Sequence, residues 1–527
     1  MPGPTYEYAG LIVGGIVVIL LVRLAIGYWA SRRVETTVDY VVAGRRLPIW
    51  MAGPSIMATW FAAETLMGSS SSAYRFGFQG VVFDPFGAAL CLILSGFLVV
   101  RLARRANYLT LMDFYERRFG KTMSIIGAVI QIITYFGWTA AQIVAGGSIL
   151  HVLLGWPLQA GMILVGTVVT LYTMMGGLWA DTALDFLQMF LICIGLAVTF
   201  GIIVSRVGGL SEFLGLAGAQ GVSQPFALWP IRDEGYLGYT GYLGIFYYLA
   251  AWMAIGLGSI PAQDYLQRTC AAQDESVAVK ATYLAAILYL IFGILPPLIG
   301  VAAYGAIGPD LEVEQTEFVL VSMTMQYLPP LLVAIFIAAL ASALMSTSDS
   351  SMLAGATMFT ENIVKVFKPD LSDKTQLWLT RLSLLVTGII SLLIALYAAT
   401  IYRLAVLSCT AILVGMVAPY IIGMYWKKAN HIGALSSMIV GTVSWVILTF
   451  AYYPITLEIC EGFVEDATWD AVYIASFPAF VISVVMLIVV SLLTQKIDPP
   501  KVMTDLDGNP LNMRNPLGFQ LGKRGDK

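Results

Sequence analysis

Apolar stretches long enough to cross a lipid bilayer recur along almost the whole chain. A helix needs about 20 apolar residues to span the hydrocarbon core, and about thirteen stretches of that size can be counted. Only 12% of the residues are charged, whereas soluble domains carry about 25%. The sequence therefore predicts an all-α integral membrane protein. The expected spans are residues 8–30, 49–76, 81–101, 123–151, 157–177, 180–205, 240–262, 280–306, 328–360, 378–401, 404–426, 432–454 and 471–495.

Lys and Arg residues concentrate in alternate loops between these spans. If the loop after the first span is cytoplasmic, most of the 29 basic residues share that side, and the opposite loops are acidic, as at Asp310, Glu312 and Glu458. Positive charge in short loops marks the cytoplasmic side. We therefore expect a multi-pass protein of the plasma or bacterial inner membrane, with its N-terminus outside and its C-terminus in the cytoplasm. The first stretch is expected to stay as a span, because no positive charge precedes it.

The composition disfavours several kinds of function. A formal net charge of −3 gives no reason to expect a nucleic-acid partner, and no obligate protein partner is evident. Two histidines and five scattered cysteines supply neither a transition-metal cluster nor the nucleophile and base of a membrane enzyme. The loops, and the Pro- and Gly-containing tail after Ile497, are too short for a core of their own. Function is therefore expected to reside in the membrane, and the tail to be extended or disordered.

Two of the expected spans contain helix breakers. The second span contains Pro54 followed by polar residues, and the seventh contains Gly256, Gly258 and Pro261. If the second span is core helix one, the seventh is core helix six, which is the offset that an inverted repeat of five plus five helices requires. Unwound segments at such breaks free backbone carbonyls for cations. The expected parts are an N-terminal span and loop at 1–48, a ten-helix core at 49–427, two further spans at 428–497 and a cytoplasmic tail at 498–527.

A polar segment, ASALMSTSDSS at 341–351, interrupts the apolar ninth span. On a helix, one face of this segment carries Ala343, Ser346, Thr347 and Ser350. Hydroxyl and carboxylate oxygens are the ligands of hard cations such as Na⁺, and ionisable groups at such depth usually mark an ion or substrate path. Alternatively, Ser and Thr bond to their own helix or join neighbouring helices. The addition of Asp349 favours the cation site.

Aromatic and acidic side chains near the first break are candidates for binding a solute. Trp60 could offer a cation–π face to a positive group, or could simply fill the core. Glu64 within a span is expected to face a cavity or a partner and not lipid. Trp138, on the fourth span, is a second candidate wall, with core packing as the alternative.

Three further carboxylates lie near the starts of expected spans. Asp84 precedes Pro85, where a helix-capping role is favoured as much as a functional one. Asp181 is expected to cap its helix at the cytoplasmic interface. Asp185 lies one turn deeper and needs a partner, for which an ion or the polar face of residues 341–351 would serve.

An ordered set of motifs resembles the sodium/solute symporter family over about residues 40–430. The motifs are GRRLP at 44–48, ATWFAAETLMG at 58–68, GGLWADTALDFLQ at 176–188, QDYLQR at 263–268 and MSTSDSS at 345–351. The resemblance implies a five-plus-five inverted-repeat core with discontinuous core helices one and six, and Na⁺ as the coupling ion.

The resemblance also implies particular cation ligands. The positions that match the family's Na⁺ site are the Ala58, Phe61 and Ala343 carbonyls and the Ser346 and Thr347 hydroxyls. Some members use a second cation site, whose matching positions are Asp185, Ser346, Asp349 and Ser350. Because Asp349 replaces a hydroxyl found in some of those members, a second ion, a proton and simple charge pairing all remain open.

Within the family, the likeness is strongest to the high-affinity choline transporters. The candidate substrate-binding residues are Trp60, Glu64, Trp138, Gln142, Ala262 and Gln263. The two tryptophans match aromatic positions that enclose the quaternary ammonium in those transporters. Ala262 and Ala88 stand where those transporters are expected to have aromatic residues, and Glu64 stands where they have Gly. Fewer aromatic residues and an added carboxylate favour an amine that donates hydrogen bonds.

We therefore expect a Na⁺-coupled symporter that imports a choline-like amine, a betaine-like solute or an amino acid. A Na⁺-coupled monocarboxylate or sugar symporter is the first alternative, although the charge of Glu64 would repel an anion. A membrane solute sensor is the second alternative, and it would need a partner protein because no output domain follows Lys496.

Overall fold

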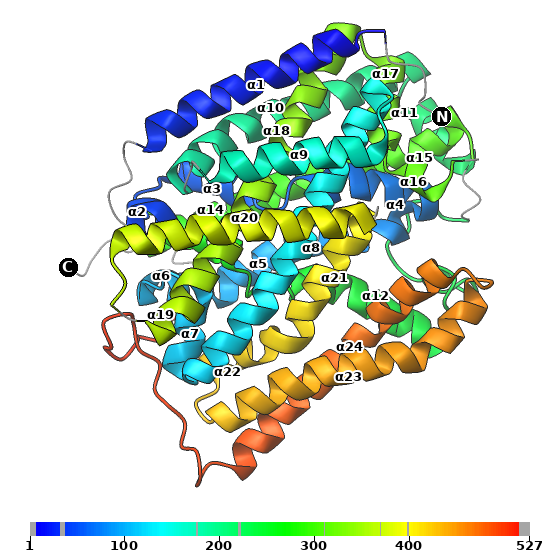
Figure 1. Ribbon diagram of the computed structural model, residues 1–527. Helices are drawn as coiled ribbons and strands as arrows, with labels where there is room; N and C mark the ends of the chain where they lie inside the picture. The colour runs from blue at the N-terminus through cyan, green and yellow to red at the C-terminus, as the bar shows by residue number, and fades with distance from the viewer. Residues whose placement is uncertain are drawn as a thin grey trace.

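The computed structural model describes residues 7–31, 37–174, 178–219, 223–309, 311–368, 370–397 and 400–515. Within these ranges the chain is almost entirely helical and forms no extended strand. The helices of the first half are α1 (Ala9–Ser31), α2 (Thr37–Val42), α3 (Ile49–Ala58), α4 (Ser69–Phe76), α5 (Ala88–Leu98), α6 (Val100–Ala106), α7 (Leu111–Arg118), α8 (Lys121–Leu154), α9 (Leu158–Thr173), α10 (Leu178–Val207), α11 (Leu210–Leu216) and α12 (Gly241–Gly256). The long helices run between the same two ends of the molecule (Figure 1).

The second half repeats this pattern of long helices joined by short ones. Its helices are α13 (Gln263–Ala271), α14 (Glu275–Gly293), α15 (Leu295–Ile307), α16 (Val313–Thr316), α17 (Val319–Tyr327), α18 (Pro330–Met358), α19 (Lys365–Phe367), α20 (Asp373–Tyr397), α21 (Ile401–Ile412), α22 (Gly423–Tyr425), α23 (His431–Ile459) and α24 (Val464–Leu493). Short π-helical segments at 64–68, 82–87, 359–364 and 413–422, with 3₁₀ turns at 43–45, 77–81 and 217–219, connect or interrupt them.

Nine helical stretches in the described residues are long and apolar enough to cross a membrane. They are Glu64–Leu98, Lys121–Leu154, Asp181–Val207, Glu275–Ile307, Pro330–Phe367, Lys374–Tyr397, Ile401–Tyr425, His431–Ile459 and Val464–Leu493. Shorter apolar helices lie at Ala9–Arg23, Ile49–Ala58, Leu158–Leu171 and Gly241–Gly256. The all-α membrane fold is confirmed, but the count of thirteen stays a prediction, since the first stretch merges parts of two expected spans.

Both breaks expected from the sequence are present. Residues 59–62 form turns between α3 and the π-helical segment that leads into α4, so core helix one is discontinuous. Residues 257–262 separate α12 from α13 in the same way. A Cβ on Gly258 would lie 2.0 Å from the Ala254 carbonyl oxygen and 2.5 Å from that of Cys409. Only glycine fits at this position, which lies just beyond Gly256, where the helical part of the expected span 240–262 ends.

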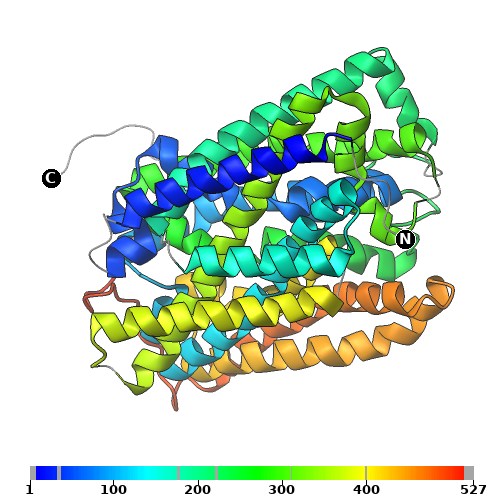
Figure 2. The same cartoon turned by 45° about the horizontal axis from the view of Figure 1, so that its top comes forward.

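Three groups of helices surround the breaks. α8 packs against α18 and α21 through the middle of the molecule, and α1 lies along α10 and α18 at its edge. α23 and α24 form a long antiparallel hairpin that packs against α12 and the segment 413–422 (Figures 1 and 2). α24 begins at Val464, earlier than the expected 471, because Glu465 and Asp466 in its first turn suit the positive end of the helix dipole.

Loops that were expected on one side of the membrane meet at one end of the molecule. The tail after α24 returns along α6 and α7, where Tyr108 Oη donates to the Thr504 carbonyl (2.7 Å) and Arg117 to that of Leu506 (2.6 Å). The Leu506 amide donates to the Ala106 carbonyl (3.0 Å). The tail up to residue 515 is therefore extended, as expected, but packed, and residues 516–527 lie outside the described part of the chain.

Candidate functional site

Trp60 and Glu64 lie at the break in core helix one and are buried. Gln142 of α8 donates from Nε2 to Glu64 Oε2 (2.8 Å) and accepts at Oε1 from the Ala63 amide (3.1 Å). Glu64 Oε1 has no hydrogen-bond partner among the described residues. The Trp60 ring packs against Tyr265 of α13, with 5.4 Å between ring centroids. The structure therefore joins α8 to the break at Glu64, and α13 to the same break at Trp60.

The remaining predicted solute residues lie around this group in different ways. Trp138 is one helical turn from Gln142 on α8 and is 4% exposed, and its Nε1 has no partner in the described chain. Ala262 immediately precedes α13 and is buried. Gln263 points elsewhere, since its Oε1 accepts from the Leu111 amide (2.6 Å). Its side chain thus holds the start of α7, and the structure does not bring it to Glu64.

Two of the predicted Na⁺ ligands meet where α3 ends against α18. Thr347 Oγ1 donates to the Ala58 carbonyl oxygen (3.2 Å), so two of the five predicted ligands already touch. Ala343 and Ser346 are buried on α18, and Phe61 lies in the unwound segment with its ring edge-on to Tyr289. Carbonyl and hydroxyl oxygens are ligands that suit Na⁺. The donor set present therefore fits that ion.

Beside these ligands lies a buried charged cluster. Arg268 of α13 donates from Nη2 to Asp181 (2.7 Å), Asp185 (3.1 Å) and Ser350 (2.5 Å). Ser346 donates to Asp185, and Ser55 Oγ donates to Asp185 Oδ2 (2.6 Å). Three of the four positions predicted for a second cation, Asp185, Ser346 and Ser350, thus come together, but they enclose a guanidinium group.

Asp349 lies apart from this cluster. It accepts from Arg23 Nη2 of α1 (2.5 Å) and from Thr173 Oγ1 (2.6 Å). One residue corresponds to about 100° around a helix, so Asp349 faces α1 while its neighbour Ser350 faces Arg268. Of the possibilities left open for Asp349, the structure shows charge pairing.

Several polar residues of the site were not identified from the sequence. Asp181 is buried and pairs with Arg268. Asp84 does not cap a helix, since its Oδ2 accepts from Thr65 Oγ1 (2.8 Å) and Tyr289 Oη (3.1 Å). The QDYLQR motif pointed to Arg268, but only the packing of α13 against α10 and α18 shows its partners. Gly176 and Gly177 of the third motif lie outside the described residues.

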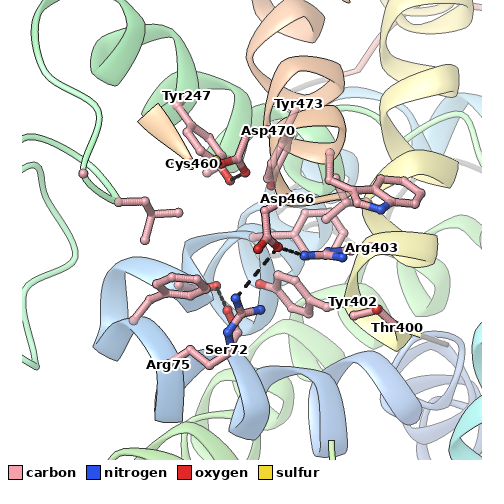
Figure 3. A pocket seen from close by; sticks show the side chains of 18 of the residues that line it. Ser72, Arg75, Tyr247, Thr400, Tyr402, Arg403, Cys460, Asp466, Asp470 and Tyr473 are labelled. Carbon is pink, nitrogen blue, oxygen red and sulfur yellow. Dashed lines mark hydrogen bonds and ion pairs between the residues drawn. The ribbon is translucent and has the colours of Figure 1, made fainter. Parts of the chain in front are cut away.

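A cavity of about 460 Å³ opens near α4, α12, α21 and the α23–α24 turn, at the end of the molecule away from the packed tail. We call it the Arg75–Asp470 cavity. Asp466 lies between the guanidinium groups of Arg75 and Arg403 (Figure 3), 3.9 Å from the first and paired with the second. Arg403 also pairs with Glu465 (2.5 Å). These ion pairs join α4, α21 and α24 at the cavity.

The geometry agrees with the comparison to known proteins. The model of the sodium:solute symporter family matches residues 40–441. The chain belongs to the sodium:solute symporter family. Human high affinity choline transporter 1 is 27% identical over 456 residues, which cover 83% of this chain and 76% of that protein. The sodium/glucose cotransporter of Vibrio parahaemolyticus is 27% identical over 475 residues, which cover 86% and 87%.

Solved structures confirm the fold of this symporter. A substrate-bound, outward-open Na⁺-coupled sialic acid symporter matches with a TM-score of 0.70 at 20% identity, covering 93% of this chain and 98% of that one. Family membership makes the chain a multi-pass membrane transporter, not an enzyme, with Na⁺ as its coupling ion. The predicted sodium-symporter core with discontinuous helices is thereby confirmed.

Proposed function

We propose that this symporter imports a small amine or zwitterion together with Na⁺, and that its N-terminus is outside and its C-terminus cytoplasmic. The observation that carries the proposal is the carboxylate of Glu64. It is fully buried at the break of core helix one, and its Oε1 has no partner in the described chain. A buried carboxylate oxygen without a hydrogen bond is costly. An ammonium group that donates to Oε1 would remove that cost.

The surroundings of Glu64 support a cationic head group. The rings of Trp60 and Tyr265 pack together beside the break, and Trp138 lies one turn from Gln142 on α8. Aromatic faces attract cations, most strongly when both are removed from water. Relatives of the chain include a choline transporter. Ala262 leaves room where those relatives are expected to have an aromatic side chain, which favours a head group held partly by hydrogen bonds.

Coupling follows from the shared unwound segment. We propose that Na⁺ binds the Ala58, Phe61 and Ala343 carbonyls and the Ser346 and Thr347 hydroxyls. The same segment, residues 59–62, carries Trp60 and leads to Glu64. An ion that fixes this segment against α18 therefore also fixes the solute site, which gives the two ligands a favourable coupling free energy. Loss of Na⁺ to the cytoplasm would release both.

A second cation is a separate part of the proposal. The second cation would bind at Asp185, Ser346 and Ser350 only after Arg268 withdraws. In the present conformation the guanidinium group contacts Asp185 and Ser350, and Ser346 donates to the same Asp185 carboxylate. Arg268 and a second ion would thus compete for one group of oxygens. Asp349, paired with Arg23, is not needed for this exchange.

The test is the thermal stability of the purified protein with choline, glycine betaine, alanine, lactate or glucose, each in Na⁺ or K⁺. A ligand that binds only the folded state raises the melting temperature. We expect stabilisation by an amine or zwitterion in Na⁺ but not in K⁺. Glu64→Gln should lose this response and keep the response to Na⁺ alone, whereas Glu212→Gln, at an exposed position, should keep both.

The alternatives give different results in the same experiment. Stabilisation by lactate would contradict the role proposed for Glu64. The similarity to a sodium/glucose cotransporter makes a sugar the second candidate, and stabilisation by glucose that survives Glu64→Gln would favour it. Retention of the amine response in Glu64→Gln would also overturn the proposed solute site.

A further inference from the structure

The Arg75–Asp470 cavity shares no residue with the solute and Na⁺ sites proposed above. Nine of its 26 lining residues are aromatic. The Tyr247 and Tyr473 rings meet edge to face with 5.2 Å between centroids, Tyr239 and Tyr247 with 5.4 Å, and Phe83 and Tyr402 with 5.3 Å. A cavity of about 460 Å³ with such walls is of the size that small ligands occupy.

Carboxylates outnumber cations in the lining of this cavity. Asp466 lies between Arg75 and Arg403 and forms an ion pair with each guanidinium group. Asp470 is held separately, because its two oxygens accept from Tyr247 Oη and Tyr239 Oη, each at 2.7 Å. In Figure 3, Asp470 lies beside Tyr247 and Tyr473, apart from the ion pairs around Asp466. The surplus of negative charge attracts a cation.

Two buried polar atoms in the lining lack a partner. Glu317 is 3% exposed, and its Oε2 makes no hydrogen bond to any described residue. Tyr473 is 7% exposed, and its hydroxyl likewise has no partner in the described part of the chain. Such groups are rare in folded proteins and call for a ligand or water. A carboxylate oxygen can only accept from a donor, so a ligand with N–H groups would satisfy it.

From these contacts we infer that the Arg75–Asp470 cavity is a second ligand site of this symporter, which binds a small organic ammonium ion. The ammonium group donates to Glu317 and faces the tyrosine rings around Asp470, where cation–π attraction adds to the charge. The site does not depend on which solute the Glu64 site carries, because no residue is common to both. It is likewise independent of Na⁺, whose predicted ligands lie elsewhere.

The experiment is equilibrium binding of n-butylammonium to the purified full-length protein, by calorimetry at pH 8, in NaCl and in KCl. At this pH Glu317 is ionised, since its pKa is about 7. We expect binding in both salts. Glu317→Gln and, separately, Asp470→Asn should each weaken it roughly tenfold or more, since each removes a charged group that the ligand faces. Glu458→Gln is the matched control, because Glu458 is exposed next to the α23–α24 turn and does not line the cavity. This variant should change the affinity for n-butylammonium less than about twofold.

Ser346→Ala separates this site from the proposed function. It should leave n-butylammonium binding in KCl unchanged, whatever it does to Na⁺-dependent responses. Absence of binding in either salt would overturn the inference. Binding that requires Na⁺ would also overturn it, because the ammonium would then occupy the Glu64 site. The same holds for binding whose affinity is unchanged in both Glu317→Gln and Asp470→Asn. If Asp470→Asn fails to fold, a Glu317→Gln protein that unfolds in a single cooperative transition is sufficient for the test.

Discussion

Arg268 and Asp185 form an ion pair that is fully buried, with 3.1 Å between Nη2 and Oδ2 and no exposure of either side chain. The pair joins α13, the second half of core helix six, to α10. It also sits on the residues at which a second cation is predicted. The Arg268 guanidinium group therefore contacts oxygens that are predicted to bind that cation, and it joins them to α13.

Replacing Arg268 with Met leaves Asp181 and Asp185 buried without their partner. Breaking such a pair costs about 3–5 kcal/mol, so we expect a large fall in the melting temperature in KCl and a partial recovery in NaCl. Arg105→Met is the control, because Arg105 and Glu275 are partly exposed and their pair contributes about 1 kcal/mol or less. Equal stabilisation of wild type and Arg268→Met by Na⁺ would argue against competition between Arg268 and the ion.

Removal of the Ser346 or Thr347 hydroxyl tests the main Na⁺ site. Ser346→Ala and Thr347→Ala should each raise the Na⁺ concentration for half-maximal transport roughly tenfold, the equivalent of about 1.4 kcal/mol. Ser348→Ala is a neighbouring control, because the Ser348 hydroxyl donates to the Leu344 carbonyl of its own helix (2.9 Å). Unchanged Na⁺ dependence in both variants, or an equal change in the control, would refute the assignment.

Asp349 should act on stability and not on Na⁺ dependence. Asp349→Asn weakens a buried pair with Arg23 and a hydrogen bond from Thr173, which we expect to cost about 2–4 kcal/mol. The melting temperature should therefore fall, with the half-maximal Na⁺ concentration in transport measurements left unchanged. A shift in that concentration as large as the one in Ser346→Ala would instead indicate that Asp349 is part of the cation site.

Glu317 lies outside the candidate membrane spans and should make stability depend on pH. Burial raises the pKa of Glu317 to about 7, and the nearby Arg75 and Arg403 charges offset only part of this. Between the ordinary pKa of 4.5 and about 7, the folded protein keeps a proton that the unfolded chain has released. Stability therefore falls as the pH rises through this window, by about 3 kcal/mol at most.

Thermal unfolding of wild type and Glu317→Gln from pH 5 to pH 8 measures this effect. The glutamine variant has no charge to bury, so its melting temperature should rise relative to that of wild type as the pH increases. A difference that is constant over the whole range would show that Glu317 titrates normally in the folded protein. The measurement needs no transport substrate.

The sequence predicted the features that depend on local pattern. Apolar length identified the membrane helices, and Gly258 and the polar residues after Pro54 identified both breaks, because each is a property of a short stretch. The contact of Thr347 with Ala58 also agrees with the predicted Na⁺ ligands. The ligand assignment as a whole and the roles of Trp60 and Glu64 stay predictions.

The partners of buried charges could not be read in the same way. Asp349 and Ser350 are adjacent in sequence, yet one pairs with Arg23 and the other with Arg268, which are far apart in the chain. Which of them faces which helix depends on how α18 is rotated against α1 and α13. Gln263 shows the same dependence, since its motif suggested a solute contact and the packing of α7 gave it backbone partners.

The packed tail has a consequence for how the molecule is made. Residues 498–515 are the last described part of the chain, and they supply backbone acceptors for Arg117 and Tyr108 and a donor for the Ala106 carbonyl. The ribosome adds these residues after α24, the last helix of the described chain. Tyr108, between α6 and α7, and Arg117, in α7, therefore lack these partners until the chain has been translated past α24. The contacts at this end of the transporter are therefore completed only after its described helices have been synthesised.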